Sequence, residues 1–243
     1  MKWKGKIFMK LLKLPQDEAF IKEVISKIDY SNALVPNCTQ ELLEKTCDEA
    51  LLYGFAAVAV FPICGEYVAK RLKGSQVHAQ VAVGFPMGNH MTATKLKEAE
   101  LALEAGVNEL DMVMNLHKFF CEDYAFVCNE VRQMAKLAAG YGVDIKLIIE
   151  SGYLSDEQKL IAGQIAIDSG AKFIKTCTGF GPGRATVHDI GLLLNAFGEK
   201  IKVKASGGIA SLDDAAGFIA MGASRSAGRH NIIEQLEKMG YKP

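Results

Sequence analysis

Short apolar runs alternate with amphipathic helical patterns along nearly the whole chain, at a repeat of about 25 to 30 residues. The apolar runs predict strands at residues 28–36, 56–61, 78–83, 109–115, 144–150, 173–176, 202–205 and 223–226. The amphipathic patterns predict helices at residues 17–27, 39–53, 65–72, 92–105, 124–141, 155–170, 186–197, 211–221 and 231–238. Strands separated by helices cannot pair as hairpins, so the alternation predicts a parallel sheet.

Eight strand–helix units are enough to close a parallel sheet on itself, which predicts a (β/α)8 TIM barrel. The length of 243 residues fits, since such barrels take about 250 residues as one unit. We therefore expect a single domain over residues 1–243, with an N-terminal extension and a capping helix in residues 1–27. No linker or break in composition indicates a second domain. A doubly wound open sheet is the alternative.

The balance of charge argues against several classes of partner. The 28 basic and 28 acidic residues cancel, so no overall field attracts nucleic acid or an anionic membrane. No apolar run approaches the roughly 20 residues needed to cross a bilayer. The basic opening from Met1 to Lys10 lacks the uninterrupted apolar stretch of a signal peptide. These observations predict a cytoplasmic protein that binds neither nucleic acid nor membranes.

Cysteine and histidine spacing gives no sign of a metal site or a disulfide framework. The six cysteines contain no C-x-x-C pair, and the five histidines show no H-E-x-x-H spacing. The glycine-rich runs do not match the G-x-G-x-x-G pattern of a nucleotide-binding fold. We expect reduced thiols, no metal and no cofactor.

Several predicted strands place charged residues on the face that should line the barrel interior. Side chains alternate across a strand, so an apolar set facing the helices leaves the other set facing inward. In the strands at 109–115, 144–150, 173–176 and 202–205, this alternation brings five charged residues toward one enclosed space: Asp111, Lys146, Glu150, Lys175 and Lys204. Buried charges are costly unless they are paired, so a cluster of both signs requires an explanation.

Position along the strands separates two explanations for these charges. Lys146 and Lys202 lie early in their strands, where they either join the cluster or form solvated ion pairs at the open bottom of the barrel. Asp111, Lys175 and Lys204 lie toward the C-terminal ends of their strands, where barrel enzymes keep their chemistry. We therefore interpret these three residues as catalytic.

Lys175 is suited to act as a nucleophile. If the strands of Lys175 and Lys204 are neighbours, they lie roughly 5 Å apart. A second cation and burial both disfavour the charge on an amine, so Lys175 can be held as a free amine near neutral pH. A neutral amine attacks an aldehyde or ketone to form a Schiff base, with Asp111 placed to move protons and Lys204 to assist. Carbon–carbon bond cleavage or formation through an enamine is the expected reaction.

Six stretches carry a resemblance to a known family: residues 54–58, 84–88, 109–115, 148–152, 175–180 and 204–209. On these stretches the chain resembles the deoxyribose-phosphate aldolases, class I aldolases of the TIM-barrel type. The resemblance implies reversible cleavage of 2-deoxy-D-ribose 5-phosphate to D-glyceraldehyde 3-phosphate and acetaldehyde. It makes Lys175 the Schiff-base lysine and gives Asp111 and Lys204 the proton-relay roles. Together with scattered apolar helix faces, it also leads us to expect a homodimer.

The chain departs from the family pattern at several positions. The usual histidine and lysine are missing from residues 29–36, and Ala59 replaces a common cysteine. Cys177 replaces the usual serine, and we interpret it as a small buried thiol rather than a nucleophile. Ala210 stands where the family has an arginine, and residues 227–229 read Ala-Gly-Arg where it has Gly-Thr/Ala-Ser. The catalytic lysines are kept, while the phosphate-binding loops are changed.

Phosphate can still be bound by backbone N–H groups in the loops after the seventh and eighth strands. We expect substrate or phosphate contacts from small residues and one arginine: Thr178, Gly179, Ser206, Gly207, Gly208, Gly228 and Arg229. Arg229 would add a bidentate charge, and a solvated helix start is the alternative for it. A substrate with a different tail, or with no phosphate, also stays open.

Two other functions fit the same residues. One is a phosphate-binding isomerase or epimerase that uses Asp111 and Glu150 as acid and base, with the lysines acting only electrostatically. The other is a non-catalytic relative that binds a sugar phosphate as a sensor. A Schiff base on Lys175 would distinguish the aldolase from both.

Overall fold

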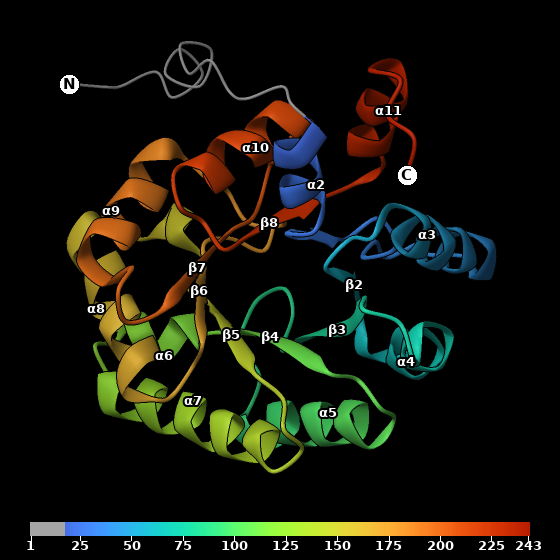
Figure 1. Cartoon of the computed structure of the whole chain (residues 1–243). Coiled ribbons are helices and arrows are strands. Elements are labelled where there is room, and N and C mark those ends of the chain that lie inside the picture. Colours follow the sequence, from blue (N-terminus) through green and yellow to red (C-terminus); the bar gives the residue numbers. More distant parts are fainter. Residues whose placement is uncertain (1–17) are drawn as a thin grey trace.

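Eight parallel strands pair in chain order and close into a barrel, with helices around the outside (Figure 1). The computed structural model describes residues 18–243, so the expectations for residues 1–17, including the opening from Met1 to Lys10, lie outside the described part. The strands are β1 (Ile28–Tyr30), β2 (Ala57–Val60), β3 (His78–Val83), β4 (Glu109–Val113), β5 (Ile145–Ile148), β6 (Phe173–Lys175), β7 (Lys202–Ala205) and β8 (Arg225–Gly228). Because β1 pairs with both β2 and β8, the open-sheet alternative is wrong and the (β/α)8 barrel is confirmed.

The helices follow the strands as predicted, with bounds shifted by a few residues at most. They are α2 (Glu18–Ile25), α3 (Gln40–Tyr53), α4 (Gly65–Leu72), α5 (Thr92–Glu104), α6 (Leu116–Phe120), α7 (Tyr124–Ala139), α8 (Asp156–Asp168), α9 (Val187–Phe197), α10 (Leu212–Ala220) and α11 (His230–Lys238), with 3-10 turns η1 (Pro62–Cys64) and η2 (Ser151–Tyr153). The sequence patterns do not predict α6, η1 or η2. No helix among residues 18–243 has the length and apolar character to span a membrane.

Local side-chain caps explain where several helices begin and end. Thr39 accepts a hydrogen bond from the N–H of Leu42 at 3.2 Å, which starts α3. Gly54 follows α3 with a φ of 72°, a left-handed conformation that glycine adopts without strain. Ser155 and Gln158 form a reciprocal capping box at the start of α8, as predicted.

The first strand is shorter than predicted. The pattern indicates a strand over residues 28–36, but β1 ends at Tyr30. The N–H of Ser31 still bonds to the carbonyl of Gly228 at 2.8 Å, and the N–H of Leu34 then bonds back to the carbonyl of Ser31. The chain therefore turns at residues 31–34, before the proline expected to stop the strand.

Strand register brings the inward charged residues of neighbouring strands to the same level. Asp111 in β4 is the partner of Lys146 in β5, and Lys175 in β6 is the partner of Lys204 in β7. The alternate residues, such as Leu110, are fully buried between the strands and the helices. The apolar core therefore lies between the barrel and its helices, and the barrel interior is free for polar groups.

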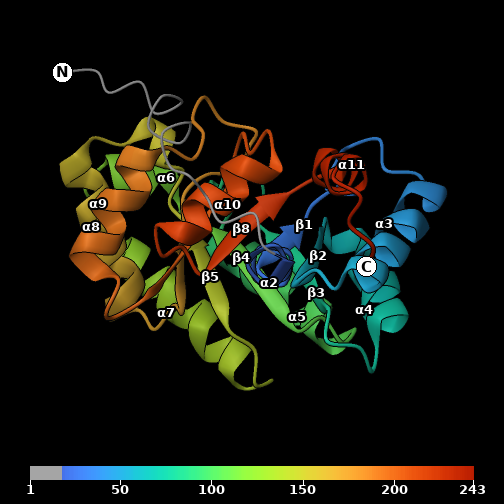
Figure 2. The same ribbon diagram turned by 45° about the horizontal axis from the view of Figure 1, so that its top comes forward.

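One described helix, α2, precedes β1. α2 buries Val24 and Ile25 and packs against α10. Figure 2 shows α2 end-on beside β1. α2 falls within the helix predicted for residues 17–27, and its role as a cap stays a prediction.

Candidate active site

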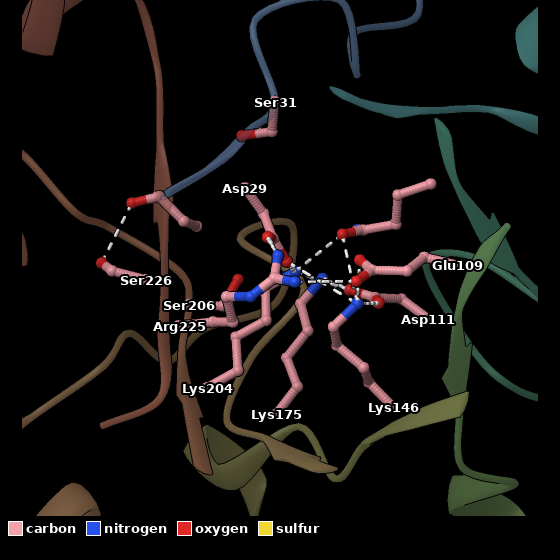
Figure 3. A network of polar contacts seen from close by, with 12 residues as sticks. Asp29, Ser31, Glu109, Asp111, Lys146, Lys175, Lys204, Ser206, Arg225 and Ser226 are labelled. Atoms are coloured by element: carbon pink, nitrogen blue, oxygen red, sulfur yellow. Dashed lines mark hydrogen bonds and ion pairs between the residues drawn. The ribbon is translucent and has the colours of Figure 1, made fainter. Parts of the chain in front are cut away.

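The three side chains predicted to be catalytic meet inside the barrel (Figure 3). Asp111 Oδ2 lies 2.8 Å from the Nζ of Lys175 and 2.8 Å from the Nζ of Lys204. Lys175 is 3% exposed, and the other two are at most 1% exposed. One carboxylate oxygen therefore bridges two amines in a site with almost no access to solvent.

Four further charged residues complete what we call the buried ion cluster, which consists of Asp29, Glu109, Asp111, Lys146, Lys175, Lys204 and Arg225 (Figure 3). Lys146 Nζ lies 3.1 Å from Asp111 Oδ1 and 2.5 Å from Glu109 Oε2. Asp29 forms ion pairs with Lys204 and with Arg225. Every member therefore has at least one partner of opposite charge within the cluster.

The cluster holds four basic side chains and three carboxylates. Full ionisation would leave one positive charge uncompensated in the interior, which is strongly unfavourable. Within the described part of the chain, Lys175 forms an ion pair with Asp111 alone, whereas Lys204 also pairs with Asp29. Lys146 pairs with three carboxylates. Lys175 is therefore the amine that loses its proton at the least cost.

Burial lowers the pKa of Lys175 to about 8. The charge of Asp111 opposes this change, and the positive charge of Lys204 adds to it. The sequence analysis names a second cation and burial as the two causes of a lowered pKa. In the structure, burial lowers the pKa of Lys175 more than Lys204 does. A fraction of Lys175 is then neutral near pH 7 and able to attack a carbonyl group.

Asp111 is held in its ionised form. Burial acts to raise its pKa, but the charges of Lys146, Lys175 and Lys204 outweigh burial and hold the pKa of Asp111 well below its usual range. An ionised carboxylate stabilises a nearby cation, and because its proton affinity is low it passes on quickly any proton that it accepts. Asp111 therefore suits both tasks beside Lys175.

Lys146 belongs to the buried ion cluster, so solvated ion pairs at the bottom of the barrel are the wrong explanation for it. It is 1% exposed, and although burial disfavours its charge, Asp111, Glu109 and Asp29 raise its pKa above the ordinary value. The partner register between β4 and β5 brings Lys146 level with Asp111. Lys202 is solvated as that explanation requires, but it forms no ion pair with a carboxylate of residues 18–243, and its Nζ lies 5.2 Å from the ring centroid of Phe173.

A pocket of about 310 Å³ reaches Lys175 and Lys204 from the mouth of the barrel. All seven predicted substrate contacts line it: Thr178, Gly179, Ser206, Gly207, Gly208, Gly228 and Arg229. Asp29, Ser31, Leu34, Ala59, Ile209 and Ala227 complete the lining. Asp111 is not among the lining residues, so it acts on the pocket through the two lysines.

The glycine loop after β7 has a shape that other residues would not adopt easily. Gly207 and Gly208 have φ values of 92° and 66°, and a Cβ on Gly207 would lie 2.7 Å from the Cβ of Cys177. The carbonyl of Gly207 accepts the N–H of Ala185 at 2.9 Å. Arg229 stands exposed at the start of α11, with no ion pair to any carboxylate of residues 18–243.

Glu150 is buried but lies apart from the other four inward residues predicted. Its Oε2 accepts the N–H of Thr178 at 3.1 Å and the Thr178 hydroxyl at 2.5 Å. Its backbone is left-handed, with a φ of 50°. Glu150 therefore fixes the loop after β6, which lines the pocket.

Cys177 packs against a second buried network beside this loop. Ser151 Oγ lies 3.4 Å from Cys177 Sγ and donates a hydrogen bond to Asp189 Oδ2 at 2.8 Å. Lys159 Nζ lies 2.8 Å from Asp189 Oδ1. We call Ser151, Lys159 and Asp189 the rim joint. Burial raises the pKa of Cys177 to about 11, so its thiol stays protonated, as expected for a small buried replacement of serine.

One group of potential metal ligands occurs among residues 18–243: Asp156, His188 and Asp189. Lys159 Nζ lies 3.0 Å from Asp156 Oδ1 and 2.8 Å from Asp189 Oδ1. One ammonium group therefore already pairs with both carboxylates. We therefore interpret the group as an ion-pair network.

The sequence analysis does not identify Asp29, Gln80 or Arg225 as site residues. Gln80 Oε1 accepts hydrogen bonds from two lysines of the buried ion cluster. Asp29 lies between Ile28 and Tyr30 in β1, and Gln80 likewise lies between apolar neighbours in β3. A single polar residue inside a short apolar strand is the signal that could have found both.

Comparison with known proteins agrees with this geometry. A family model described as DeoC/LacD family aldolase matches residues 23–231. A deoxyribose-phosphate aldolase from Caldanaerobacter subterraneus is 40% identical over 227 residues, which cover 92% of this chain and 97% of the relative. Another, from Thermococcus kodakarensis, is 41% identical over 208 residues, which cover 84% of this chain and 92% of the relative.

A solved structure supports the same grouping. The tetrameric deoxyribose phosphate aldolase from Aeropyrum pernix superposes with a TM-score of 0.81 at 27% identity, covering 93% of this chain and 100% of that one. The family match and the two sequence relatives each extend over most of the barrel. This enzyme is a lyase, and the chain belongs to the DeoC/LacD family of aldolases.

Proposed function

We propose that the enzyme reversibly cleaves 2-deoxy-D-ribose 5-phosphate into D-glyceraldehyde 3-phosphate and acetaldehyde through a Schiff base on Lys175. The observation that carries this proposal is the buried amine of Lys175, which lines the pocket and whose pKa is lowered to about 8. Such an amine attacks carbonyl groups near neutral pH. The substrate comes from the names of the relatives from C. subterraneus and T. kodakarensis.

In the cleavage direction, the neutral amine of Lys175 attacks the aldehyde carbon C1 of the open-chain sugar. The carbinolamine loses water and becomes an iminium ion, which draws electrons from the neighbouring bond. Removal of the proton from the C3 hydroxyl breaks the C2–C3 bond, releases D-glyceraldehyde 3-phosphate and leaves an enamine on Lys175. Protonation of the enamine at C2 and addition of water release acetaldehyde and restore the amine.

Asp111 and Lys204 supply the proton transfers in this proposal. Asp111 Oδ2 lies 2.8 Å from Lys175 Nζ, within reach of the protons on that nitrogen, and a water molecule would extend its reach to the oxygen of the carbinolamine. Its negative charge also stabilises the iminium ion. Lys204 lies 2.8 Å from the same oxygen and can return the proton that Asp111 takes up. The remaining members of the buried ion cluster hold these two groups in place.

The isomerase alternative is less well supported. It requires Asp111 and Glu150 to act as an acid–base pair on one substrate, but the Oε2 of Glu150 is engaged by the Thr178 backbone and hydroxyl. A related sugar with another phosphate position, or with none, is the second candidate substrate. Ala210 favours it, since this exposed residue brings no charge to the phosphate-binding loop.

Reductive trapping tests the Schiff base. Incubation with acetaldehyde and borohydride should add one ethyl group, located on Lys175 by peptide mass spectrometry. Lys175→Met should abolish the adduct and the cleavage activity, while Lys202→Met, on the exposed lysine of the neighbouring strand, should keep both. An adduct that persists in Lys175→Met, or sugar conversion without any adduct, would refute the proposal.

A comparison of 2-deoxyribose 5-phosphate with 2-deoxyribose tests the substrate. We expect a clearly higher kcat/KM for the phosphorylated sugar, because four glycines and Arg229 line the pocket. Equal kcat/KM values would favour the non-phosphorylated alternative.

We also propose that the enzyme is a cytoplasmic homodimer. Exposed apolar side chains such as Ile63, at 91% exposure, and Met91, at 77%, support an assembly. The related A. pernix enzyme is described as a tetramer. Light scattering in solution should give the mass of two chains, and the mass of four would contradict the dimer. Fractionation of cells should recover the enzyme with the cytoplasm.

A further inference from the structure

The loop after β6 is fixed on both sides of Arg184. The backbones of Gly183 and Gly152 pack so closely that a Cβ on Gly183 would lie 2.3 Å from the Cα of Gly152. On the other side, the N–H of Ala185 bonds to the carbonyl of Gly207 at 2.9 Å. The Cα of Arg184 is therefore held next to the glycine loop that lines the pocket.

The side chain of Arg184 runs along Gly208. A Cβ on Gly208 would lie 2.8 Å from the Cβ of Arg184 and 3.3 Å from its Cδ, so the arginine stem fills the space that a side chain at 208 would need. Gly208 lines the pocket and Arg184 does not. The stem of Arg184 therefore lies beside the glycine loop, next to a residue that lines the pocket.

Arg184 has no carboxylate partner for its charge in the described part of the chain. It is exposed, and no carboxylate among residues 18–243 forms an ion pair with it. Two residues beyond Gly208, Ala210 is exposed and uncharged, and its N–H bonds to Asp214 at 3.0 Å. The glycine loop thus has an unpaired arginine on one side and no basic residue at position 210.

We propose that Arg184 binds the phosphate end of the substrate at the outer edge of the pocket, supplying with Arg229 the positive charge that Ala210 lacks. The assignment rests on the proposed function, since it takes the substrate to carry a phosphomonoester. A guanidinium can donate two parallel hydrogen bonds to phosphate oxygens. Because the stem already packs on Gly208, less side-chain freedom is lost on binding.

The kinetic test compares Arg184→Met, which keeps the stem, with Arg184→Lys, which keeps a positive charge. In Arg184→Met, KM for 2-deoxyribose 5-phosphate should rise roughly tenfold, with kcat within about twofold of wild type. Arg184→Lys should show a smaller rise. The kcat/KM for unphosphorylated 2-deoxyribose and the acetaldehyde adduct on Lys175 should stay at wild-type levels, because neither depends on phosphate.

The control is Arg132→Met, which removes an exposed arginine of α7 from the other pocket, near the start of β5. It should leave both kinetic constants unchanged. An unchanged KM in Arg184→Met, or equal losses on the two sugars, would overturn the assignment of Arg184.

Binding of inorganic phosphate separates this assignment from the proposed function. Calorimetric titration of the free enzyme should give a phosphate Kd roughly tenfold weaker for Arg184→Met than for wild type or Arg132→Met. If wild type does not cleave 2-deoxyribose 5-phosphate but its phosphate binding still depends on Arg184, the proposed function fails and the assignment stands. Equal phosphate binding by wild type and Arg184→Met would refute the assignment whatever reaction the enzyme catalyses.

Discussion

The buried ion cluster and the glycine loops at the pocket mouth face the same substrate, yet they are built in opposite ways. In the cluster, charged side chains from the strands are packed against one another and almost wholly removed from water. At the mouth, glycines in left-handed backbone conformations form the wall of the pocket. The charged side chains there are exposed arginines such as Arg184 and Arg229. The low dielectric of the interior strengthens every interaction between charges in the cluster, whereas water and salt screen the charges at the mouth.

This difference explains which positions can change. Moving one charge in the cluster disturbs all its partners, because a buried charge without a partner is costly. At the mouth, backbone N–H groups bind an anion with little help from particular side chains, so an arginine can be lost at 210 and a charge supplied elsewhere. We therefore expect cluster variants to alter kcat and pH dependence for any aldehyde, and mouth variants to alter only KM for phosphorylated substrates.

After the complete loss expected for Lys175→Met, the largest effect should come from Asp111→Asn. The amide cannot take up a proton, and it removes the counter-charge that three lysines share, so kcat should fall about 10²–10⁴-fold. The loss should be equal for 2-deoxyribose and its 5-phosphate, as measured by steady-state cleavage assays. Asp213→Asn, on an exposed aspartate of α10, is the matched control and should be silent. A loss of activity confined to the phosphorylated sugar would contradict the proposed difference between cluster variants and mouth variants.

Lys204→Met should change the pH dependence. The charge of Lys204 lowers the pKa of Lys175, so its removal raises that pKa above about 8 and reduces the neutral fraction at pH 7. Adduct formation with acetaldehyde should then have a higher midpoint pH, and its rate at pH 7 should fall roughly in proportion to the neutral fraction of Lys175. Lys202→Met is the control from the same strand. A midpoint that stays in place or moves down would show that burial alone sets the pKa.

At the mouth, Gly207→Ala should reduce stability and substrate binding together. Its φ of 92° and the 2.7 Å approach to Cys177 Cβ both oppose a side chain. Gly54→Ala isolates the backbone cost, since Gly54 has a φ of 72° and nothing within 4 Å of an added Cβ. Both should lower the free energy of unfolding by about 1 kcal/mol, with a further loss only for Gly207→Ala. Only Gly207→Ala should raise KM, and equal denaturation curves would exclude the steric contribution.

The smallest effect should come from Arg229→Met. An exposed guanidinium gains little from a charge pair in water, about 0.2–1 kcal/mol, so KM for 2-deoxyribose 5-phosphate should rise by roughly fivefold or less. High salt should shrink the difference from wild type, because it screens exposed charges. A change in kcat, or in KM for unphosphorylated 2-deoxyribose, would place Arg229 in the chemistry and contradict the comparison.

The sequence predicts most of the strands, and the meeting of three inward residues, because both follow from the periodicity of the apolar residues. Alternation within strands is enough to bring Lys175, Lys204 and Asp111 to one side of the sheet. It does not show how far each strand is displaced along its neighbour, and for that reason it leaves Lys146 ambiguous and does not find Asp29. Only the closed barrel reveals that β1 lies between β2 and β8, which brings Asp29 to Lys204 and Arg225.

The rim joint has a consequence for how substrate enters and leaves. Ser151 follows β5, Lys159 belongs to α8 and Asp189 to α9, so a buried ion pair and a hydrogen bond hold three separate elements together. Separating these three elements would break the buried ion pair between Lys159 and Asp189 away from water, which is costly. We therefore expect the rim joint to be rigid. Local opening motions should instead be largest in residues 31–38, the loop between β1 and α3 that also lines the pocket. We expect amide hydrogen exchange to be fastest there and slowest at the joint.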